Sequence, residues 1–315
     1  MKLLFLADVH IKLGQKKVPI QWQTKRFTDL FQAIQNATCE HDISEVIIGG
    51  DLFDSPKPSV HELVLGISLV NSLTTPVTIF AGNHECTSKR ESILSILQPL
   101  FKESVNIIDY DYRSEDYDII PYTHLHNEKW LPPQAKLLMT HVRGNIGTLV
   151  KSEIDLDKFK QWPLVLAGDL HDHSMTQENI VYPGSPVNTN FSRERSENEH
   201  GFIIVDTDTL EWEFHPLDLP QLIRKTVTST DQMLKSDYDH VIYEIAGDSV
   251  ALANVKDHEL LDKKVNTEYQ SQASLDLQNK TYSEELAYYL SEVQQLEPEE
   301  ITRLITKVKQ YDRDS

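Results

Sequence analysis

The sequence predicts an α/β fold, in which short strands alternate with helices. Three observations lead to this class. Short apolar runs alternate with amphipathic helical patterns through the first two thirds of the 315-residue chain. Several of these runs end in acidic, amide or histidine side chains, at the place where strands of an open α/β sheet carry a site. The chain is also long enough to bury a full core in one large domain and to add a smaller unit.

The elements of the first two thirds follow from the spacing of apolar residues. In the segment 23–40 these residues recur at i, i+3, i+4 and i+7, as in a helix: Phe27, Leu30, Phe31 and Ile34. A second helix is expected at 59–73. Buried strands, each a short apolar run, are expected at 2–8, 45–51, 76–85, 117–122, 135–141 and 163–169.

The last third predicts further strands and then a change of organisation. Strands at 179–185, 201–207 and 210–217 are expected to be antiparallel. The doublet Leu219–Pro220 places the end of the large domain at residue 218. The expected units after it are a small α+β capping domain at 219–265, a polar linker at 266–281 and a helical tail at 282–315. The last helix opens on glutamates, which suit a helix N-terminus.

The composition indicates an ordinary globular protein, with 39% hydrophobic and 25% charged residues. No apolar run approaches the ~20 residues of a membrane span, so no membrane association is expected. The first apolar run is interrupted at Asp8, which is too early for the ~7–15 apolar residues of a secretory signal. The two cysteines, Cys39 and Cys86, are too few for a disulfide framework. We therefore expect a reducing, cytoplasmic setting.

The net charge of −19 argues, taken alone, against a protein that binds nucleic acid. The distribution of charge is nevertheless uneven. Residues 11–27 contain no acid and five bases, which are Lys12, Lys16, Lys17, Lys25 and Arg26. This stretch is either a solvated basic loop or a surface that contacts phosphates.

Five expected strand ends carry oxygen and nitrogen ligands. In chain order these ligands are Asp8 and His10, Asp51 and Asp54, Asn83 and His84, His141, and His171 with His173. Carboxylate, amide and imidazole groups suit divalent Mn, Fe or Zn. A set without a thiolate does not resemble a structural zinc site, which is built on cysteines. The set predicts two metals bridged by Asp51, which lies in the middle of the series of loops. Two such ions can activate water for in-line attack on phosphorus.

In chain order, the motifs "DVH", "GDLFD", "GNHE", "THV" and H-x-H resemble the motif set of the calcineurin-like metallophosphoesterases. The resemblance covers residues 8–173 and implies a four-layer α/β/β/α sandwich. Within that superfamily, "GDLFDSPKPS" resembles the SbcD-type recombination-nuclease subunits, because Ser55 stands where protein phosphatases usually carry arginine. The segment 182–202, "YPGSPVNTNFSRERSENEHGF", resembles the same type. The compact length is similar to that of phage-encoded subunits, which implies the cytoplasm of a bacterium or a phage-infected host.

Matched by position, the resemblance implies two metal sites. One ion would be held by Asp8, His10, Asp51 and His173, and the other by Asp51, Asn83, His141 and His171. His84 matches the family's catalytic histidine, which is not a ligand. Asp54 matches the acid that hydrogen-bonds to that histidine and orients it. The implied metal is Mn²⁺, with Mg²⁺, Fe²⁺ and Zn²⁺ as alternatives.

The sequence departs from the family pattern after Gly168. The usual form is Gly-His-x-His, whereas Asp169 follows the glycine here and the histidines come at His171 and His173. If Asp169 replaced His171 as a ligand, the second metal site would be harder and richer in oxygen. A rival H-x-H pair exists at His124 and His126, but residues 171 and 173 fit the family order, after "THV" and before "YPGS".

We expect a Mn²⁺-dependent DNA nuclease, acting as an endonuclease, an exonuclease or both, in an SbcCD-like recombination and repair complex. The expected partners are DNA, an SbcC-type coiled-coil ATPase bound through residues near 282–311, and a second copy of the chain, giving a homodimer within a heterotetramer. Segments 59–73 and 90–100 are candidates for the dimer contact. The residues expected to contact DNA are Lys12, Lys16, Lys17, Trp22, Lys25, Arg26 and Arg143, with Arg193 as a further candidate.

Two other functions stay open. A small-molecule phosphodiesterase or phosphatase of the same fold would suit the acidic composition. A catalytically inert scaffold would leave the work to the ATPase partner. The helical tail, in turn, either binds that partner or packs on its own domain.

Overall fold

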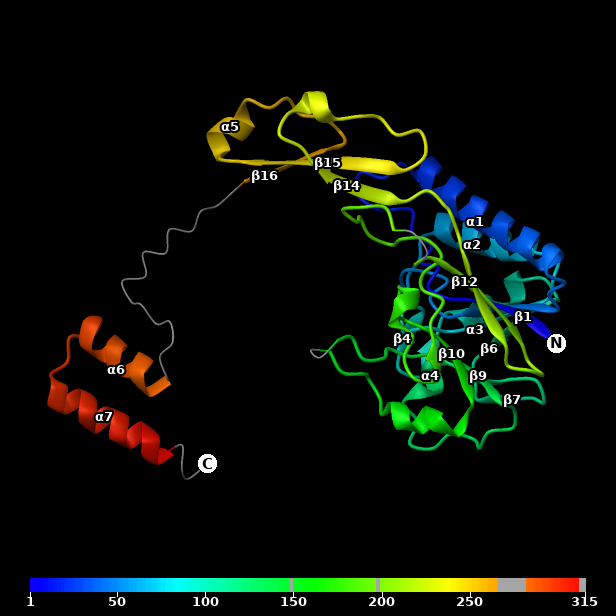
Figure 1. The fold of residues 1–315 in the computed structure, drawn as a ribbon, viewed down its shortest axis with the longest axis horizontal. Coiled ribbons are helices and arrows are strands. Elements are labelled where there is room, and N and C mark those ends of the chain that lie inside the picture. The colour runs from blue at the N-terminus through cyan, green and yellow to red at the C-terminus, as the bar shows by residue number, and fades with distance from the viewer. Residues whose placement is uncertain (148–149, 197–198, 266–281, 312–315) are drawn as a thin grey trace. The chain divides into compact units, whose positions relative to one another are not determined.

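The protein is described by a computed structural model that covers residues 1–147, 150–196, 199–265 and 282–311 (Figure 1). The chain forms two compact units, Met1–Val265 and Asn266–Ser315, and each is described here by itself. The linker expected at 266–281 lies outside the described residues. No helix in the described part of the chain is long and apolar enough to cross a membrane.

The first unit is built around a six-stranded sheet with the strand order β13-β12-β1-β2-β3-β6. Four of its strands are parallel: β1 (Lys2–Leu6), β2 (Glu45–Gly49), β3 (Val77–Phe80) and β6 (Val105–Ile108). Two later strands extend it in the antiparallel sense: β12 (Gly201–Asp206) and β13 (Trp212–Pro216). The amino-terminal strand therefore lies in the interior of the sheet.

A second sheet of five strands has the order β11-β10-β9-β8-β7. Its members are β7 (Tyr112–Arg113), β8 (Asp118–Ile120), β9 (Leu137–His141), β10 (Leu164–Gly168) and β11 (Ile180–Val181). The prediction of an antiparallel strand near 179–185 was wrong, because β11 pairs with β10 in the parallel sense. The long loop between β10 and β11 therefore runs back to the amino-terminal end of β10, and it carries His171 and His173.

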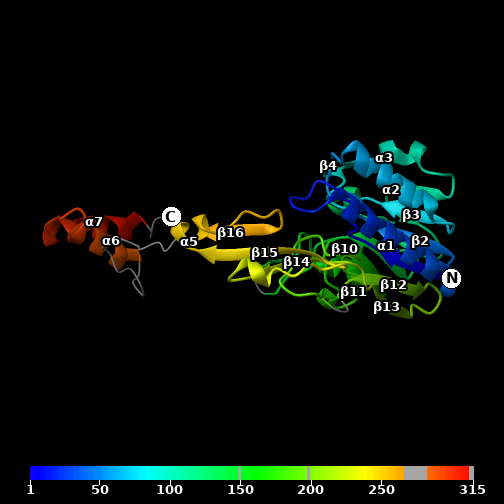
Figure 2. The same cartoon turned by 90° about the horizontal axis from the view of Figure 1, so that it is seen from above.

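The core is arranged in layers, with side chains alternating along each strand. In β1, Leu3 and Phe5 pack between the two sheets, against Met139 and Leu166 of the second sheet. Leu4 and Leu6, on the opposite face of β1, pack instead under two long helices. These helices are α1 (Ile20–Glu40) and α2 (Val60–Ser72), which lie side by side over the first sheet (Figures 1 and 2).

The outer face of the second sheet is covered by a cluster around Phe159, Trp162 and Tyr182. The short helix α4 (Tyr122–Leu125) and a 3₁₀ helix (Leu156–Gln161) supply part of this layer. The order helices, sheet, sheet, short helices confirms the predicted four-layer α/β/β/α class. Smaller elements complete the body: β4 (Cys86–Ser88), β5 (Glu91–Ser92), α3 (Leu94–Leu97) and 3₁₀ turns at Gln98–Leu100, His173–Met175 and Thr230–Gln232.

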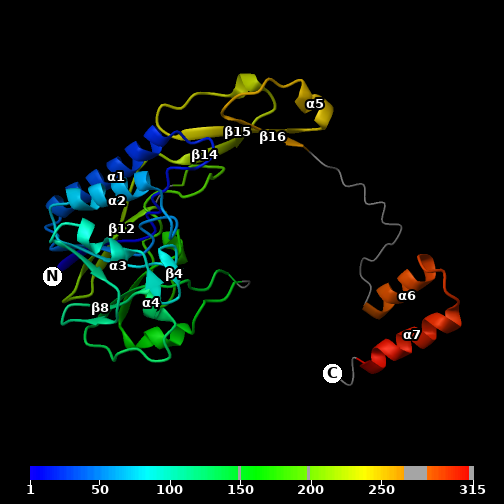
Figure 3. The ribbon, with the colours of Figure 1, turned by 180° about the vertical axis from the view of Figure 1, so that it is seen from behind.

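Residues after Leu219 form a three-stranded parallel sheet with its own apolar cluster, which we call the cap. Its elements are β14 (Leu222–Thr226), β15 (His240–Gly247), α5 (Ser249–Ala253) and β16 (Leu261–Val265) (Figure 3). In the second unit, α6 (Tyr282–Glu292) and α7 (Pro298–Tyr311) form a helical pair.

Candidate metal centre

Polar side chains from five strand ends meet at one edge of the two sheets. Asp8 and His10 follow β1, Asp51 follows β2, and Asn83 follows β3. From the second sheet, His141 ends β9, while Asp169 and His171 follow β10. Because the parallel strands of both sheets end on the same side, residues more than a hundred positions apart come into contact.

One group of donor atoms surrounds His10. Its Nε2 atom lies 3.1 Å from Nε2 of His171 and 3.5 Å from Oδ2 of Asp51. The Nε2 atom of His171 is in turn 3.8 Å from Oδ1 of Asp8. Asp8, His10 and His171 offer three ligand atoms within 4.8 Å of one another, which is the spacing of a cation site.

A second group surrounds His141. Its Nε2 atom lies 3.0 Å from Oδ1 of Asn83, 3.5 Å from Oδ2 of Asp51 and 3.8 Å from Oδ1 of Asp169. The Nδ1 atom donates to the carbonyl oxygen of Gly49, 2.9 Å away, so Nε2 is the ring nitrogen that faces the acids. Asp51 therefore lies between the two groups, with Oδ2 at 3.5 Å from a histidine of each.

The donor set fits divalent cations. Asp8 and Asp51 are buried, and no ion pair among the described residues joins either of them to lysine or arginine. Burial raises the pKa of Asp8 to about 7. Burial also acts on the pKa of Asp51 in the upward direction, but His141 and His10 outweigh it and lower that pKa to about 2. Burial, with His10 close by, lowers the pKa of His171 to about 4, so this imidazole is neutral.

The backbone is strained at several of the residues that supply these donor atoms. Asp8, His10, Asp51 and Asp169 all have positive φ angles, between 49° and 95°, a region that non-glycine residues seldom adopt. Gly82 allows the closest approach, since a Cβ atom there would lie 2.1 Å from Oδ1 of Asp51. Such strain persists only where the surroundings enforce it, and four of the nine non-glycine residues with positive φ in the described part of the chain lie in this one cluster.

His84 lies at the edge of the cluster, but Asp54 orients it differently from the prediction. The Nδ1 atom of His84 donates to the backbone carbonyl of Asp54, 2.8 Å away, and not to its carboxylate. The carboxylate lies 3.4 Å from Nδ1 of His10 and 2.6 Å from Nζ of Lys12. The side chain of Asp54 therefore supports His10, because the chain turns back between residues 51 and 54 and presents its carbonyl to His84.

The structure does not bring His173 into the cluster. Its Nδ1 atom donates to the carbonyl of Tyr182, 2.6 Å away, and its ring stacks on Phe214 with centroids 3.9 Å apart. His171 takes the place expected for His173, beside Asp8, and Asp169 takes the place expected for His171, beside His141. Each of these two places is thus occupied by a residue two positions earlier in the chain than the one that the resemblance implies.

The rival pair also lies elsewhere: His124 contacts Thr123, and His126 lies 3.5 Å from Glu153.

Two site residues were missed or left as an alternative. Asp169 was the alternative, and the spacing from Gly168 to His171 was the available signal, since it equals the spacing from the glycine to the second histidine of Gly-His-x-His. Glu85 was missed. Its buried carboxylate accepts hydrogen bonds from the backbone amides of Asp51, Phe53 and Gly82, and so joins the loops after β2 and β3.

The residues expected to contact DNA differ in their exposure and in their contacts within the protein. Arg26 is only 2% exposed and donates to the carbonyl and side-chain oxygens of Asn188, so its burial rules out the predicted DNA contact. Trp22 is half-buried, with its indole N–H 3.4 Å from the carbonyl of Tyr238 and the Arg26 guanidinium over its ring. Lys17 pairs with Asp262 of the cap at 2.7 Å.

The remaining bases reach the surface. They are Lys12, which pairs with Asp54; Lys25, which pairs with Asp29; Arg193, which pairs with Glu244; and the exposed Lys16 and Arg143.

Two packed sheets with such a cluster of acids and imidazoles at their strand ends are typical of the metal-dependent phosphoesterases. The calcineurin-like phosphoesterase family model matches residues 1–171, and the chain belongs to this family.

Among the relatives is a protein of Escherichia phage T5 named "Probable exonuclease subunit 1", 42% identical over 100% of this chain and 99% of its own length. "Putative phosphoesterase 078R" of Invertebrate iridescent virus 3 is 26% identical over 73% of this chain and 70% of its own. "DNA double-strand break repair protein Mre11" of Archaeoglobus fulgidus is 32% identical over 32% of this chain and 23% of its own. The predicted relationship is confirmed.

Proposed function

We propose that the protein is a two-metal, Mn²⁺-dependent DNA nuclease and acts as the nuclease subunit of a recombination complex. The observation that carries this proposal is the pair of donor groups sharing Asp51 at the strand ends. The family supports phosphoester chemistry, and the names of the phage and archaeal relatives support DNA as the substrate.

Each ion has its own set of residues in this proposal. Asp8, His10, Asp51 and His171 hold one ion, and Asp51, Asn83, His141 and Asp169 hold the other. The second set contains a single nitrogen ligand, which favours Mn²⁺ or Mg²⁺ over softer ions. Once bound, the two ions lower the pKa of water and neutralise charge that develops on the phosphoryl oxygens.

His84 is the residue that we assign to proton transfer. Its Nδ1–H is fixed by the carbonyl of Asp54, and its backbone N–H donates to Oδ1 of Asp51 at 2.9 Å. The ring stands edge-on to His10, with centroids 4.6 Å apart. Its Nε2 atom is therefore held close to the metal cluster, where the doubly protonated ring can donate a proton to the leaving oxygen and become the neutral imidazole with its proton on Nδ1.

The assembly is proposed from exposed apolar residues. Val60 and Val64 of α2, and Ile96 and Leu100 of the later segment 90–100, are 57–78% exposed and suit a contact with a second copy. Tyr289 of α6 and Val293, which directly follows this helix, are 42% and 44% exposed and suit the coiled-coil ATPase partner. The word "subunit" in the name of the phage T5 relative supports a complex of this kind.

The test compares wild type with His84→Ser and with His61→Ser, an exposed histidine on α2. With Mn²⁺, the wild type and His61→Ser are expected to cleave single-stranded or branched DNA. His84→Ser is expected to bind the same number of Mn²⁺ ions and to cleave at least about 100-fold more slowly. Hydrolysis of a cyclic nucleotide but not of DNA would favour the small-molecule enzyme. No cleavage by wild type, even with its ATPase partner, would refute the enzyme.

A further inference from the structure

The segment 185–192, which we call the bridge, touches the metal cluster directly. The backbone N–H of Ser185 donates to the carbonyl of His171, 3.1 Å away. Its hydroxyl lies 2.6 Å from the carbonyl of Asp8, and the side chain is fully buried. Ser185 therefore ties together the two loops that supply Asp8 and His171.

Thr189 reaches the imidazole of His171 itself. Its Oγ1 atom lies 3.3 Å from Nδ1 of His171, on the side of the ring opposite the cluster. The other ring nitrogen, Nε2, faces His10 and Asp8. For Nε2 to offer a lone pair to a cation, Nδ1 must carry the proton, and Thr189 is the acceptor placed to receive that hydrogen bond.

The bridge is also anchored to the cap. The side chain of Asn188 accepts from the backbone N–H of Leu222 at 3.0 Å and donates to the carbonyl of Leu222 at 3.0 Å. Ser192 adds two backbone hydrogen bonds to the same strand, one with Leu222 and one with Arg224. The first strand of the cap is thus bonded to the segment that contacts His171.

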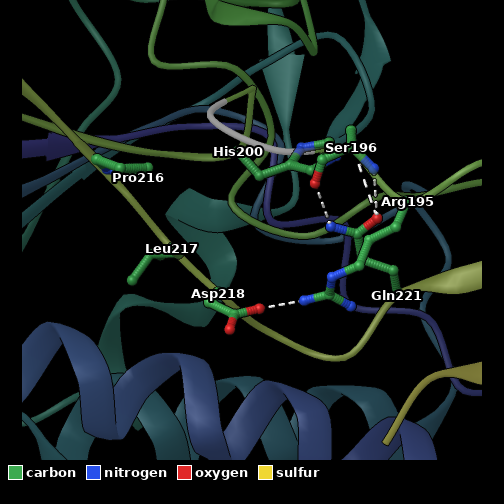
Figure 4. A pocket seen from close by; sticks show the side chains of 7 residues that line it. All are labelled: Arg195, Ser196, His200, Pro216, Leu217, Asp218 and Gln221. Carbon is green, nitrogen blue, oxygen red and sulfur yellow. Dashed lines mark hydrogen bonds and ion pairs between the residues drawn. The ribbon is translucent and has the colours of Figure 1, made fainter.

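Two neighbouring contacts hold this junction in place. Arg26 is buried beside Asn188 and donates to both of its oxygens, and no ion pair joins it to an acid among the residues that the structure describes. Past the bridge, Arg195 pairs with Asp218, and Gln221 bonds reciprocally with Ser196, as Figure 4 shows. The residues that lead into β14 are therefore fixed to the same loop.

We propose that Thr189 is a positioning residue, which orients His171 for the metal and couples the metal centre to the cap through Asn188. This inference rests on the proposed metal site and adds a defined route from that site to the cap. The route runs from His171 through Thr189 and Asn188 to Leu222. By reciprocity, filling the metal site must stabilise the contact with the cap to the extent that the cap contact favours metal binding.

The first test measures Mn²⁺ binding to the full chain by titration with detection of the free ion. Thr189→Val keeps the shape of the side chain but removes the hydroxyl, and Thr189→Ser keeps the hydroxyl. We expect Thr189→Val to weaken one of two Mn²⁺ ions by about tenfold and Thr189→Ser to bind within about twofold of wild type. Wild-type affinity in Thr189→Val would overturn the positioning role. A wild-type chain that binds no Mn²⁺ would instead refute the proposed metal centre.

The second test follows amide hydrogen exchange in the peptide that contains residues 220–226. Mn²⁺ is expected to slow exchange there several-fold in wild type, because the amide of Leu222 is bonded to Asn188. In Thr189→Val the slowing is expected to be lost at the same metal occupancy. Equal exchange with and without Mn²⁺ in the wild type would overturn the coupling to the cap.

Discussion

At the scale of single residues, Asp169 is the feature that separates this chain from the usual family pattern. It stands where Gly-His-x-His has its first histidine, and its carboxylate lies 3.8 Å from His141. Its backbone N–H donates to both oxygens of Asp8, at 3.0 and 3.1 Å, so one residue contacts both groups of donors. An acid at this place adds negative charge to a buried cluster, and a bound cation would offset that cost.

The register at residues 169–173 is testable by counting metal ions. Asp169→Ala is expected to bind one Mn²⁺ about tenfold or more weakly than wild type, because a ligand of the His141 group is lost. His173→Ala serves as the matched control and is expected to bind both ions normally, because His173 is bonded to Tyr182 and not to the cluster. Equilibrium dialysis with Mn²⁺ measures both. Normal binding by Asp169→Ala together with the loss of one Mn²⁺ ion in His173→Ala would instead support His171 and His173 as the ligands.

The affinity for Mn²⁺ should depend on pH in a defined direction. Burial raises the pKa of Asp8 to about 7, so below that pH this carboxyl holds a proton that the metal must displace. The pKa of His141 is also raised well above its usual value, chiefly by Asp51 against the effect of burial. Both groups must lose a proton, and affinity should therefore rise from pH 6 to pH 8, by about tenfold or more. Titrations that give equal affinity at the two pH values would contradict this.

Much of the site could be predicted from the sequence, since its residues follow apolar strands. Asp8, Asp51, Asn83 and His141 come directly after such runs, and the fold brings them together. The sequence could not separate His171 from His173, because the two histidines stand two positions apart and only the path of the loop directs one of them to the cluster and the other to Tyr182. Glu85 could not be found, because its partners are backbone amides, which leave no pattern in the side chains.

At the scale of elements, the loops after β2 and β3 depend on Glu85 for their relative position. Three backbone amides point at its carboxylate, two from the loop after β2 and one from the loop after β3. Both loops supply donors to the metal cluster, Asp51 from one and Asn83 from the other. The carboxylate therefore determines how far apart these two donors stand.

Glu85→Gln tests this connection. A glutamine amide N–H₂ group cannot accept the bonds that the carboxylate accepts, so at least one buried amide loses its partner. We expect the free energy of unfolding to fall by about 1–3 kcal/mol, together with weaker Mn²⁺ binding. Glu91→Gln, at an exposed position in β5, is the control and should leave both unchanged. Chemical denaturation and Mn²⁺ titration measure the two effects. A Glu85→Gln protein with the stability and Mn²⁺ affinity of wild type would show that Glu85 does not set the relative position of the two loops.

The elements themselves were predictable to different degrees. The strands β1, β2, β3, β9 and β10 lie within their predicted segments, because each is a continuous apolar run buried on both faces. The strand β16 was missed, since "LDKKV" carries charges that stay partly exposed at the edge of the cap. The direction of β11 depends on the path of a long loop, which local periodicity does not encode.

At the scale of the whole molecule, the apolar cores divide the chain unevenly. All four buried clusters lie within residues 3–261, including the one in the cap. Within the unit Asn266–Ser315, none of the described residues 282–311 belongs to them. The stability of the first unit should therefore be independent of the second.

A chain ending at residue 265 tests this division. We expect it to melt within about 2 °C of the full chain and to bind the same number of Mn²⁺ ions, because no core residue is removed. We also expect it to lose association with the ATPase partner, which the full chain retains as the reference. Calorimetry and a pull-down with the partner measure the two results. A marked drop in melting temperature would show that the helical pair packs on its own domain.

The interior position of β1 also sets the order of events during synthesis. This strand leaves the ribosome long before β12, which is one of its two neighbours, with Lys2 opposite Asp206. At 5–20 residues per second, that neighbour emerges roughly 10–40 s later. Both proposed ligand sets also wait for the segment that carries Asp169 and His171. A chain stalled before that point in translation therefore lacks a complete set, and the protein gains its proposed chemistry only after this segment has been made and has folded back onto β1 and β2.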